Sequence, residues 1–477
     1  MDSARRATIL VVGGALLISG CGSGATRHRA TSNAATPVPA TQKETRQPAA
    51  FSYPPAPRPA STSAGANDLD LLVSSFARSG TVDVGALTAV QRSHDPRVGW
   101  LLSDKLRFVA PGADEQRLVA AFRRVSGVDP RRDPDFRSSA WLSITNHLIA
   151  WDLASPPRYR ALKQRIFTRI DAGWKPFFDD ARSAIDWRLV SWGGVPIDAR
   201  PSGDRKPCPR GCIPALDNPG LTSAARGSWY ADLKPVFGVV VGTHAVAFPK
   251  NIMEIHEMVN VTIGGRRLGI PYCTLCGSAQ AYFTDRVAGQ RAPLVLRTSG
   301  LLSRSNKVMY DLRTRSVFDT FTGEALSGPL HDRNVTLHQT SVVVSTWGAW
   351  KRAHPTTQIV ARDGGIGRTY PADPLRGRDA NGPIFPIGPA DPRLAVQEQI
   401  AGVAVRGQRP IAFPVDQATA ALADGKPVAV GDVMLVRDGD GVRARLRSGR
   451  AVATHQAFWF AWSQFHPNTV VWTPLTR

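Results

Sequence analysis

The chain has 477 residues, of which 43% are hydrophobic, and its formal net charge is +21. This length is sufficient for two or three domains beside terminal segments. The 59 Lys and Arg residues are spread along the chain without a nucleic-acid-binding motif. We therefore expect no nucleic-acid partner, and the charge is compatible with contacts to anionic lipids or envelope polymers.

Residues 1–20 have the pattern of a secretory signal peptide. Arg5 and Arg6 precede an apolar run, residues 7–18, that is too short to cross a bilayer as a helix. The run ends in "LISGC", which resembles a bacterial lipobox, a motif whose cysteine becomes an acylated N-terminus. We expect acylation of Cys21, for example by palmitate, and a lipoprotein that is exported and anchored to the outer face of the cell membrane. An ordinary signal peptide followed by a chance cysteine is the alternative.

Two segments of different composition follow the signal. Residues 21–67 are rich in Ala, Thr, Ser and Pro and cannot bury a core, so they predict a disordered linker behind the lipid anchor. Residues 68–190 predict a helical domain. In "GADEQRLVAAFRRVSG", acidic residues occupy the first turn, basic residues occupy the last turn, and Leu118, Phe122 and Val125 share one face.

An internal repeat occupies the rest of the chain. Residues 236–250 match residues 400–415, and residues 347–360 match residues 459–472 through a shared Trp-x-x-Trp-x-x-x-His-Pro pattern. The offset between the copies is 164 residues at the first match and 112 at the second, so the second copy is 52 residues shorter between them. We therefore expect a duplicated scaffold in which the longer copy carries an insert.

The repeat and the helical domain together predict an α+β fold: a helical N-terminal domain followed by a duplicated, mainly β unit with short helices. Copy one would span residues 191–370 and include the insert, and the shortened copy two would span residues 371–477. Any chemistry is expected in the insert, because both copies need the repeated parts for the scaffold. Trp347 and Trp459, one in each copy, are expected to be buried.

The insert contains the Cys-x-x-Cys pair of "IPYCTLCGSAQAY", Cys273 and Cys276. If Cys21 is acylated, four cysteines remain, and this even number in an oxidising compartment favours two disulfides with three connectivities. Gly277 follows the second cysteine where a c-type haem requires His, which excludes covalent haem. The segment "SAQAYF" predicts a strand, whereas a thioredoxin-type active site would start a helix.

Soft ligands lie in the same part of the sequence. A short helix predicted in "FPKNIMEIHEMVN" carries Met253 and His256, and Met309 lies in a later strand. Thiolate, thioether and imidazole groups together suit copper or zinc. The candidate metal or redox site therefore contains the residues His256, Cys273, Cys276, Met253 and Met309. The alternatives are a plain disulfide and methionines that fill gaps in the core.

Cys208 and Cys212 lie on a proline-rich loop, "KPCPRGCIP", and are a candidate disulfide. Three arrangements are open for them: a bond to each other, bonds to Cys273 or Cys276, or a four-sulfur site.

Five blocks, "GCIPALDNPG", "AVAFPKNIMEIHEMVN", "PYCTLCGSAQAYF", "SGLLSRSNKVMYDLRTRSVFDTFTGEALSGPL" and "WGAWKRAHPTTQIV", resemble in order those of the family catalogued as domain of unknown function 3179. The resemblance covers residues from about 191 to the C-terminus and implies no assigned activity. The family usually has Tyr-Cys-Pro-Leu followed by Cys or Thr, and Thr274 replaces the proline here. His256 and Cys273 carry over best, and the matching polar positions are Glu257, Asn260, Ser299, Arg304, Ser305, Tyr310 and Asp311.

Three functions are compatible with these observations. The first is an envelope lipoprotein with a Cys/His site for soft-metal binding or thiol redox chemistry. The second is a non-enzymatic binding or scaffold lipoprotein whose cysteines form structural disulfides. The third is a hydrolase or transferase in which Cys273 is the nucleophile and His256 the base.

Overall fold

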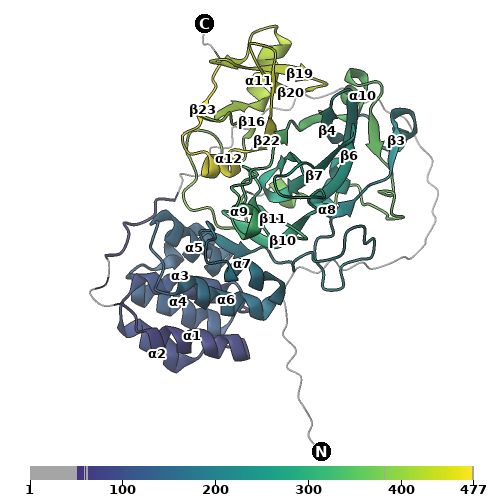
Figure 1. The fold of residues 1–477 in the computed structure, drawn as a ribbon. Coiled ribbons are helices and arrows are strands. Elements are labelled where there is room, and N and C mark those ends of the chain that lie inside the picture. Colours follow the sequence, from purple (N-terminus) through teal and green to yellow (C-terminus); the bar gives the residue numbers. More distant parts are fainter. Residues whose placement is uncertain (1–50, 59, 61–62, 381, 475–477) are drawn as a thin grey trace, which may run out of the picture. The chain divides into compact units, whose positions relative to one another are not determined.

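The computed structural model describes residues 51–58, 60, 63–380 and 382–474 (Figure 1). The expected signal peptide, Cys21 and most of the expected linker lie outside these residues. No helix in the described part of the chain is long and apolar enough to span a bilayer. The fold is α+β, as the sequence predicts, with helices between residues 66 and 179 and a mainly β region after them.

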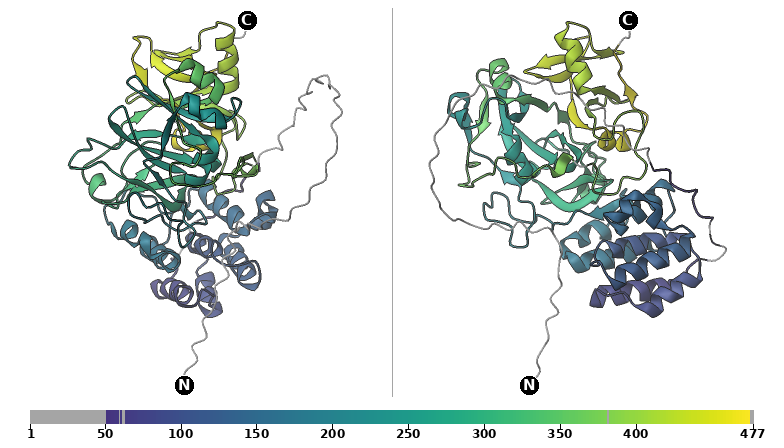
Figure 2. Two further views of the ribbon diagram at one scale, coloured as in Figure 1. Left: turned by 90° about the vertical axis from the view of Figure 1, so that its right-hand side faces the viewer. Right: turned by 180° about the vertical axis from the view of Figure 1, so that it is seen from behind.

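The N-terminal region is a set of packed helices (Figures 1 and 2). Helix α4 ends at Gly127, whose φ of 71° closes the helix in the left-handed conformation. Its stripe of Leu118, Phe122 and Val125 is buried, as the periodicity predicts. The helices are α1 (Ala66–Ser79), α2 (Val84–Arg92), α3 (Gly99–Leu106), α4 (Ala113–Ser126), α5 (Ala140–Ala150), α6 (Tyr159–Ile170) and α7 (Lys175–Asp179).

Two sheets contain the repeated elements. In copy one the strand order is β14-β4-β5-β15-β3, and in copy two it is β22-β16-β17-β23. The strands of copy one are β3 (Leu221–Ser223), β4 (Pro235–Val241), β5 (His244–Pro249), β14 (Val343–Thr346) and β15 (Gln358–Val360), with helices α8 (Lys250–His256) and α10 (Trp347–Ala353). Those of copy two are β16 (Gln399–Val403), β17 (Ile411–Pro414), β22 (His455–Phe458) and β23 (Val470–Val471), with helices α11 (Val415–Ala423) and α12 (Trp459–Phe465).

The two repeated sheets are built in the same way. In each, an antiparallel hairpin is followed by a helix, and the last strand pairs in parallel with the second strand of the hairpin. Trp347 and Trp459 are both fully buried, which confirms the expectation from the sequence. The indole nitrogens of Trp350 and Trp462 donate hydrogen bonds to threonine hydroxyls seven residues later, over 3.0 Å and 2.8 Å. The duplication is therefore present in the packing as well as in the sequence.

Two further sheets combine the strands of the insert with β1 and β2, which precede β4 in the chain, and copy two has one more sheet. Strand order is β13-β9-β7-β6-β2 in the first, with β8 paired to β7, and β1-β10-β11-β12 in the second. Their strands are β1 (Val190–Trp192), β2 (Leu216–Asp217), β6 (Met258–Ile263), β7 (Arg266–Cys273), β8 (Ser278–Ala279), β9 (Ala281–Phe283), β10 (Leu296–Ser303), β11 (Asn306–Asp311), β12 (Val317–Asp319) and β13 (Gln339–Thr340), with the short helix α9 (Gly328–His331). The additional sheet of copy two contains β18 (Ala429–Val430), β19 (Val433–Asp438), β20 (Gly441–Leu446) and β21 (Ala451–Val452).

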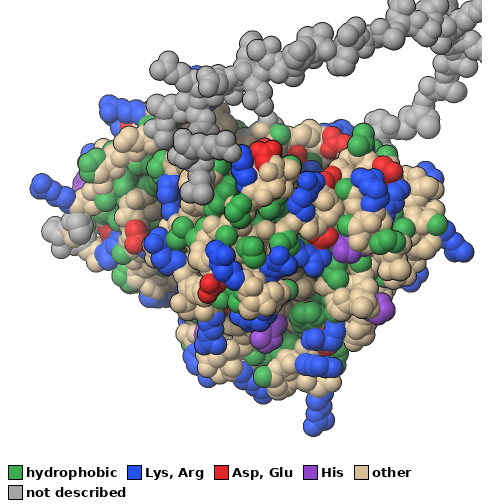
Figure 3. All heavy atoms as spheres, turned by 90° about the horizontal axis from the view of Figure 1, so that it is seen from above, with side chains coloured by type: hydrophobic (Ala, Val, Ile, Leu, Met, Phe, Trp, Pro, Cys, Tyr) green, Lys and Arg blue, Asp and Glu red, His purple; other side chains and the backbone are tan. Residues whose placement is uncertain are grey.

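One hydrophobic cluster joins the helices to the sheet that contains β10 and β11. The indole of Trp174 donates to the carbonyl of Ser299 over 2.7 Å, and the buried Lys163 donates to the carbonyl of Val190 over 2.6 Å. Lys and Arg side chains are scattered over the face shown in Figure 3, among hydrophobic and polar groups. This distribution matches the even spread of basic residues along the sequence.

Candidate functional site

The Cys-x-x-Cys pair lies at a hairpin turn. Strand β7 ends at Cys273, residues 274–276 form one 3-10 turn, and the chain returns as β8, which pairs Ser278 with Cys273. Gly277 closes the turn with a φ of 58°, and an added Cβ there would lie 2.9 Å from Gln399. The turn leaves the two cysteine side chains close together. Glycine suits position 277 because it adopts a positive φ without strain and has no Cβ that would contact Gln399.

The two sulfur atoms lie in contact inside the protein. Their Sγ atoms are 2.6 Å apart, and both residues are free thiols with exposed fractions of 3% and 0%. The carbonyl oxygen of Ser305 lies 3.2 Å from the Sγ of Cys276 and 3.9 Å from that of Cys273. Ser305 and Arg304 form the two-residue turn between β10 and β11, and both have positive φ values.

The environment separates the acidities of the two thiols. Burial raises the pKa of Cys276 well above its usual value, and the neighbouring Cys273 raises it further. Burial also raises the pKa of Cys273, but the hydrogen bond from Cys276 and the backbone N–H and positive charge of Lys307 outweigh it, so its pKa is lowered. The Nζ of Lys307 is 2.5 Å from one carboxylate oxygen of Glu257, and the other oxygen accepts a hydrogen bond from Thr274 over 3.1 Å.

His256 contacts groups other than the cysteines. It is the last residue of α8, its Nδ1 donates to the carbonyl of Pro214 over 2.6 Å, and its Nε2 accepts from the hydroxyl of Tyr370 over 2.7 Å. Burial lowers its pKa to about 4, so the imidazole is neutral near pH 7. Both ring nitrogens are therefore used in hydrogen bonds that hold a loop and a distant segment against α8.

The candidate methionines lie in two hydrophobic clusters that differ from the cluster around the cysteines. Met253 packs with core residues of β4 and β5, and Met309 packs with Met258 and Tyr282. Cys273 and Cys276 pack instead with Trp459 and other apolar residues of copy two. The structure thus brings the two cysteines together with copy two and places the candidate thioethers in the cores of copy one.

Most of the polar positions suggested by the family resemblance hold the backbone of the insert. Asn260 donates to Asp217 and accepts from the backbone of Leu296. Tyr310 donates to the carbonyl of Asp198 over 2.7 Å. The Asp311 carboxylate accepts from two backbone N–H groups, and the Ser299 hydroxyl donates to the carbonyl of Val308. Of these positions, Ser305 contacts the sulfurs through its carbonyl oxygen, and the charge of Glu257 raises the pKa of both thiols.

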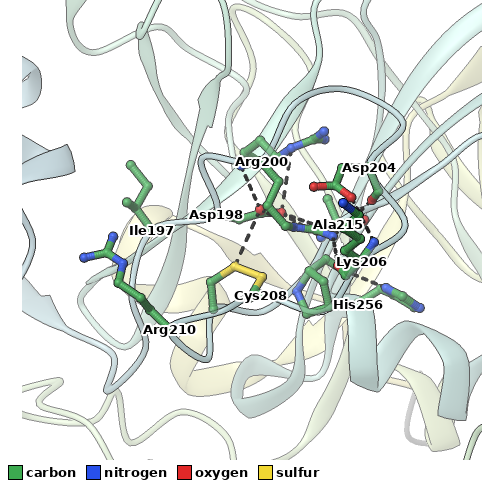
Figure 4. The surroundings of a disulfide bond; sticks show 12 residues. Ile197, Asp198, Arg200, Asp204, Lys206, Cys208, Arg210, Ala215 and His256 are labelled. Atoms are coloured by element: carbon green, nitrogen blue, oxygen red, sulfur yellow. Dashed lines mark hydrogen bonds and ion pairs between the residues drawn. A yellow bond between two sulfur atoms is a disulfide. The ribbon is translucent and has the colours of Figure 1, made fainter.

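Cys208 and Cys212 form a disulfide in a loop that is also held by a buried ion pair (Figure 4). Arg200 pairs with Asp198 over 2.7 Å and donates to three carbonyls of the same loop. Asp198, Cys208 and Cys212 are the only three His, Cys, Asp or Glu residues of the described chain whose ligand atoms all lie within 4.8 Å of one another. The two sulfurs there are bonded to each other, so the arrangement is that of a clamped loop.

A family model described as a protein of unknown function (DUF3179) matches residues 210–448, about half of the chain. The chain belongs to this family. The match begins in the disulfide loop and extends through the insert into copy two, so it includes Cys212, Cys273 and Cys276, and Cys208 lies two residues before it. No curated protein and no solved structure matches the chain.

Sequence reasoning missed three polar residues beside the thiols of this DUF3179 protein. Lys307 supplies a positive charge that lowers the pKa of Cys273. In the sequence it stands directly before the apolar residues of strand β11. Ser278 lies opposite Cys273 in the β7–β8 hairpin, and Gln280 directly follows β8. Their side-chain polar atoms are buried and have no hydrogen-bond partner among the described residues. The residue that pairs with Cys273 in the hairpin therefore carries a buried hydroxyl without a partner among the described residues.

Proposed function

We propose that this DUF3179 protein is an envelope lipoprotein, anchored to the membrane through Cys21, whose Cys273–Cys276 pair is a dithiol–disulfide redox centre. The observation that carries the proposal is the 2.6 Å separation of the two sulfurs at the end of one hairpin. A small change in the cysteine side-chain torsions brings sulfurs at this separation to bonding distance.

The unequal acidities support the same chemistry. Disulfide exchange and oxidation begin with one thiolate, and the second thiol remains protonated until its sulfur is attacked. Lys307 and Cys276 stabilise the thiolate of Cys273, and burial keeps Cys276 protonated. Oxidation would join the sulfurs and transfer two electrons and two protons to a small-molecule oxidant, because burial keeps a bulky partner away from both sulfurs.

The redox state can be measured by equilibrating the protein in buffers of reduced and oxidised dithiothreitol, trapping free thiols with a maleimide and recording the intact mass. In a Cys208→Ser/Cys212→Ser background, the remaining pair should convert reversibly between two alkylated thiols and none while the protein stays folded. The matched Cys276→Ser variant should remain alkylated at one site under all conditions. A pair that is reduced only after unfolding would identify a structural disulfide and contradict the proposal.

The lipid anchor is tested separately by changing Cys21 to Ala in the expressed precursor. The wild-type protein should sediment with membranes and incorporate radiolabelled palmitate, and the variant should do neither. Equal membrane association of the two would contradict the proposed anchor.

Copper(I) binding is a second candidate, because the same geometry places two soft sulfur ligands in an apolar cluster. Two thiolates are half of the ligands that tetrahedral zinc requires, so the pair suits copper better than zinc. Reduced protein titrated with copper(I) against a chromogenic chelator should take up one equivalent, and Cys273→Ser should take up none. Equal uptake by both proteins would exclude this pair as the copper site.

A further inference from the structure

The two partners of the hydrogen bond between His256 and Tyr370 each line a cavity. The first has a volume of about 370 Å³ and is lined by His256 and by the loop that contains the Cys208–Cys212 disulfide. The second has a volume of about 700 Å³ and is lined by Tyr370 and by residues that precede β4. Arg368 lines both, so one segment of chain forms a wall of each cavity and the two lie next to each other.

The cavities carry an excess of unpaired positive charge. Five cationic side chains line them, and none forms an ion pair within 4.0 Å in the described part of the chain: Arg205, Lys206, Lys234, Arg362 and Arg368. Of the three carboxylates that line them, Asp217 is held by Arg297 over 2.6 Å, which leaves Asp204 and Asp363. Burial keeps His256 neutral. Cationic groups without carboxylate partners favour an anionic ligand.

Aromatic side chains gather in the second cavity only. Trp229 and Tyr230 have ring centroids 5.3 Å apart, and Tyr370 lies on the same lining as Arg368. The indole N–H of Trp229 and the side-chain carbonyl of Asn251 are buried without a hydrogen-bond partner among the described residues. Apolar faces with a few polar groups are typical of a pocket for a small ring-shaped ligand.

The walls of the first cavity are held in place before any ligand arrives. Arg200 donates to the carbonyls of Asp204 and Lys206, and the disulfide closes the loop beyond them. Figure 4 shows Lys206 on this loop and His256 beside it. The hydrogen bond from His256 to the carbonyl of Pro214 holds the part of the lining that follows the disulfide against α8. A preorganised site requires less ordering when a ligand binds.

We infer that the two cavities together bind an acidic sugar, with its phosphate or carboxylate between Arg368 and Lys206 and its ring against the aromatic residues. The choice of a sugar rather than a nucleotide rests on the proposed export of the protein, because acidic glycans belong to the envelope. The charge and the aromatic lining do not depend on that proposal.

Isothermal titration calorimetry with glucose 6-phosphate, glucuronate, glucose, inorganic phosphate and AMP tests the inference. Both acidic sugars should bind, and glucose and phosphate should each bind at least about tenfold more weakly, because each lacks one half of the contacts. The absence of binding by both acidic sugars would overturn the inference, as would tighter binding of AMP or equal affinity for phosphate alone.

Variants on two separate segments locate the site. Arg368→Ala and Lys206→Ala should each weaken glucose 6-phosphate binding about tenfold, whereas Arg406→Ala, which removes an exposed cation in copy two, should leave it unchanged. Equal losses in all three would indicate unspecific charge attraction and overturn the site. The Cys273→Ser/Cys276→Ser variant should bind the sugar normally. Failure of the redox proposal would therefore leave sugar binding unchanged, and the two proposals can be tested separately.

Discussion

The ammonium group of Lys307 lies 2.5 Å from a carboxylate oxygen of Glu257, and this buried ion pair borders the thiol of Cys273. The exposed fractions of the two side chains are 2% and 14%. Beside the larger effects of burial and of the hydrogen bond with Cys276, Glu257 raises the pKa of Cys273 and Lys307 lowers it, so the two members of the ion pair act on this thiol in opposite directions. Glu257 directly follows α8 and Lys307 lies in β11, so the ion pair joins two segments of the insert that are far apart in sequence.

Replacing Lys307 with Met should raise the pKa of Cys273, because the cation is lost while burial and Glu257 continue to disfavour the thiolate. The ultraviolet absorbance of the thiolate, recorded against pH, measures this shift. The free energy of unfolding should fall by about 3 kcal/mol, since Glu257 is left without its cation. The matched Lys426→Met change breaks an exposed pair with Asp424 and should cost less than about 1 kcal/mol. An unchanged thiol pKa would show that Lys307 does not act on Cys273.

Gly238→Ala and Gly402→Ala should destabilise the protein to a similar degree. An added Cβ would lie 2.3 Å from the ring of Trp350 at the first position and 2.2 Å from the ring of Trp462 at the second. Such overpacking typically costs about 1–3 kcal/mol, which urea unfolding measures. Gly85→Ala, on the exposed side of α2, is the control and should be neutral or stabilising by up to about 1 kcal/mol. A large effect at only one of the two tryptophan contacts would argue against equivalent packing of the copies.

Stability should fall as the pH is lowered from about 6.5 towards 4, in part through His256. Its pKa is about 4 in the folded protein and about 6.5 in an unfolded chain, so only the unfolded state takes up the proton in this interval. Above pH 6.5 this contribution is fully present, and it is lost as the pH falls, up to about 3 kcal/mol. In His256→Asn the free energy of unfolding should decline less steeply between these pH values. His455 and His466, whose pKa values burial lowers to about 3 and about 4, retain their contributions in both proteins. Parallel pH profiles would contradict this assignment.

Removing the Cys208–Cys212 disulfide by the double change to Ser should lower the free energy of unfolding by about 2 kcal/mol, because the cysteines are 4 residues apart and close a short loop. The same change should weaken binding of glucose 6-phosphate, since the loop forms a wall of the first cavity. Binding that is unchanged while stability falls would separate the disulfide from the proposed sugar site.

Local pattern was sufficient to predict several elements. The helix over residues 113–126 and the short helix that carries Met253 and His256 depend on caps, periodicity and neighbours within a few residues. The duplication could also be predicted, because both copies keep the aromatic residues that pack on the hairpins. One expected strand, "SAQAYF", is divided into β8 and β9 at Gln280, where the chain changes its pairing partner.

The α+β class, the repeat and the proximity of Cys273 to Cys276 could be predicted from the sequence, because they follow from residues that are neighbours along the chain or share a periodic pattern. The side chains that surround the sulfurs could not be predicted in this way. His256 is paired with Tyr370, which lies 114 residues later, and Lys307 rather than an imidazole lies beside Cys273. Such contacts depend on how the sheets pack together, and the spacing of residues within one segment carries no information about that packing.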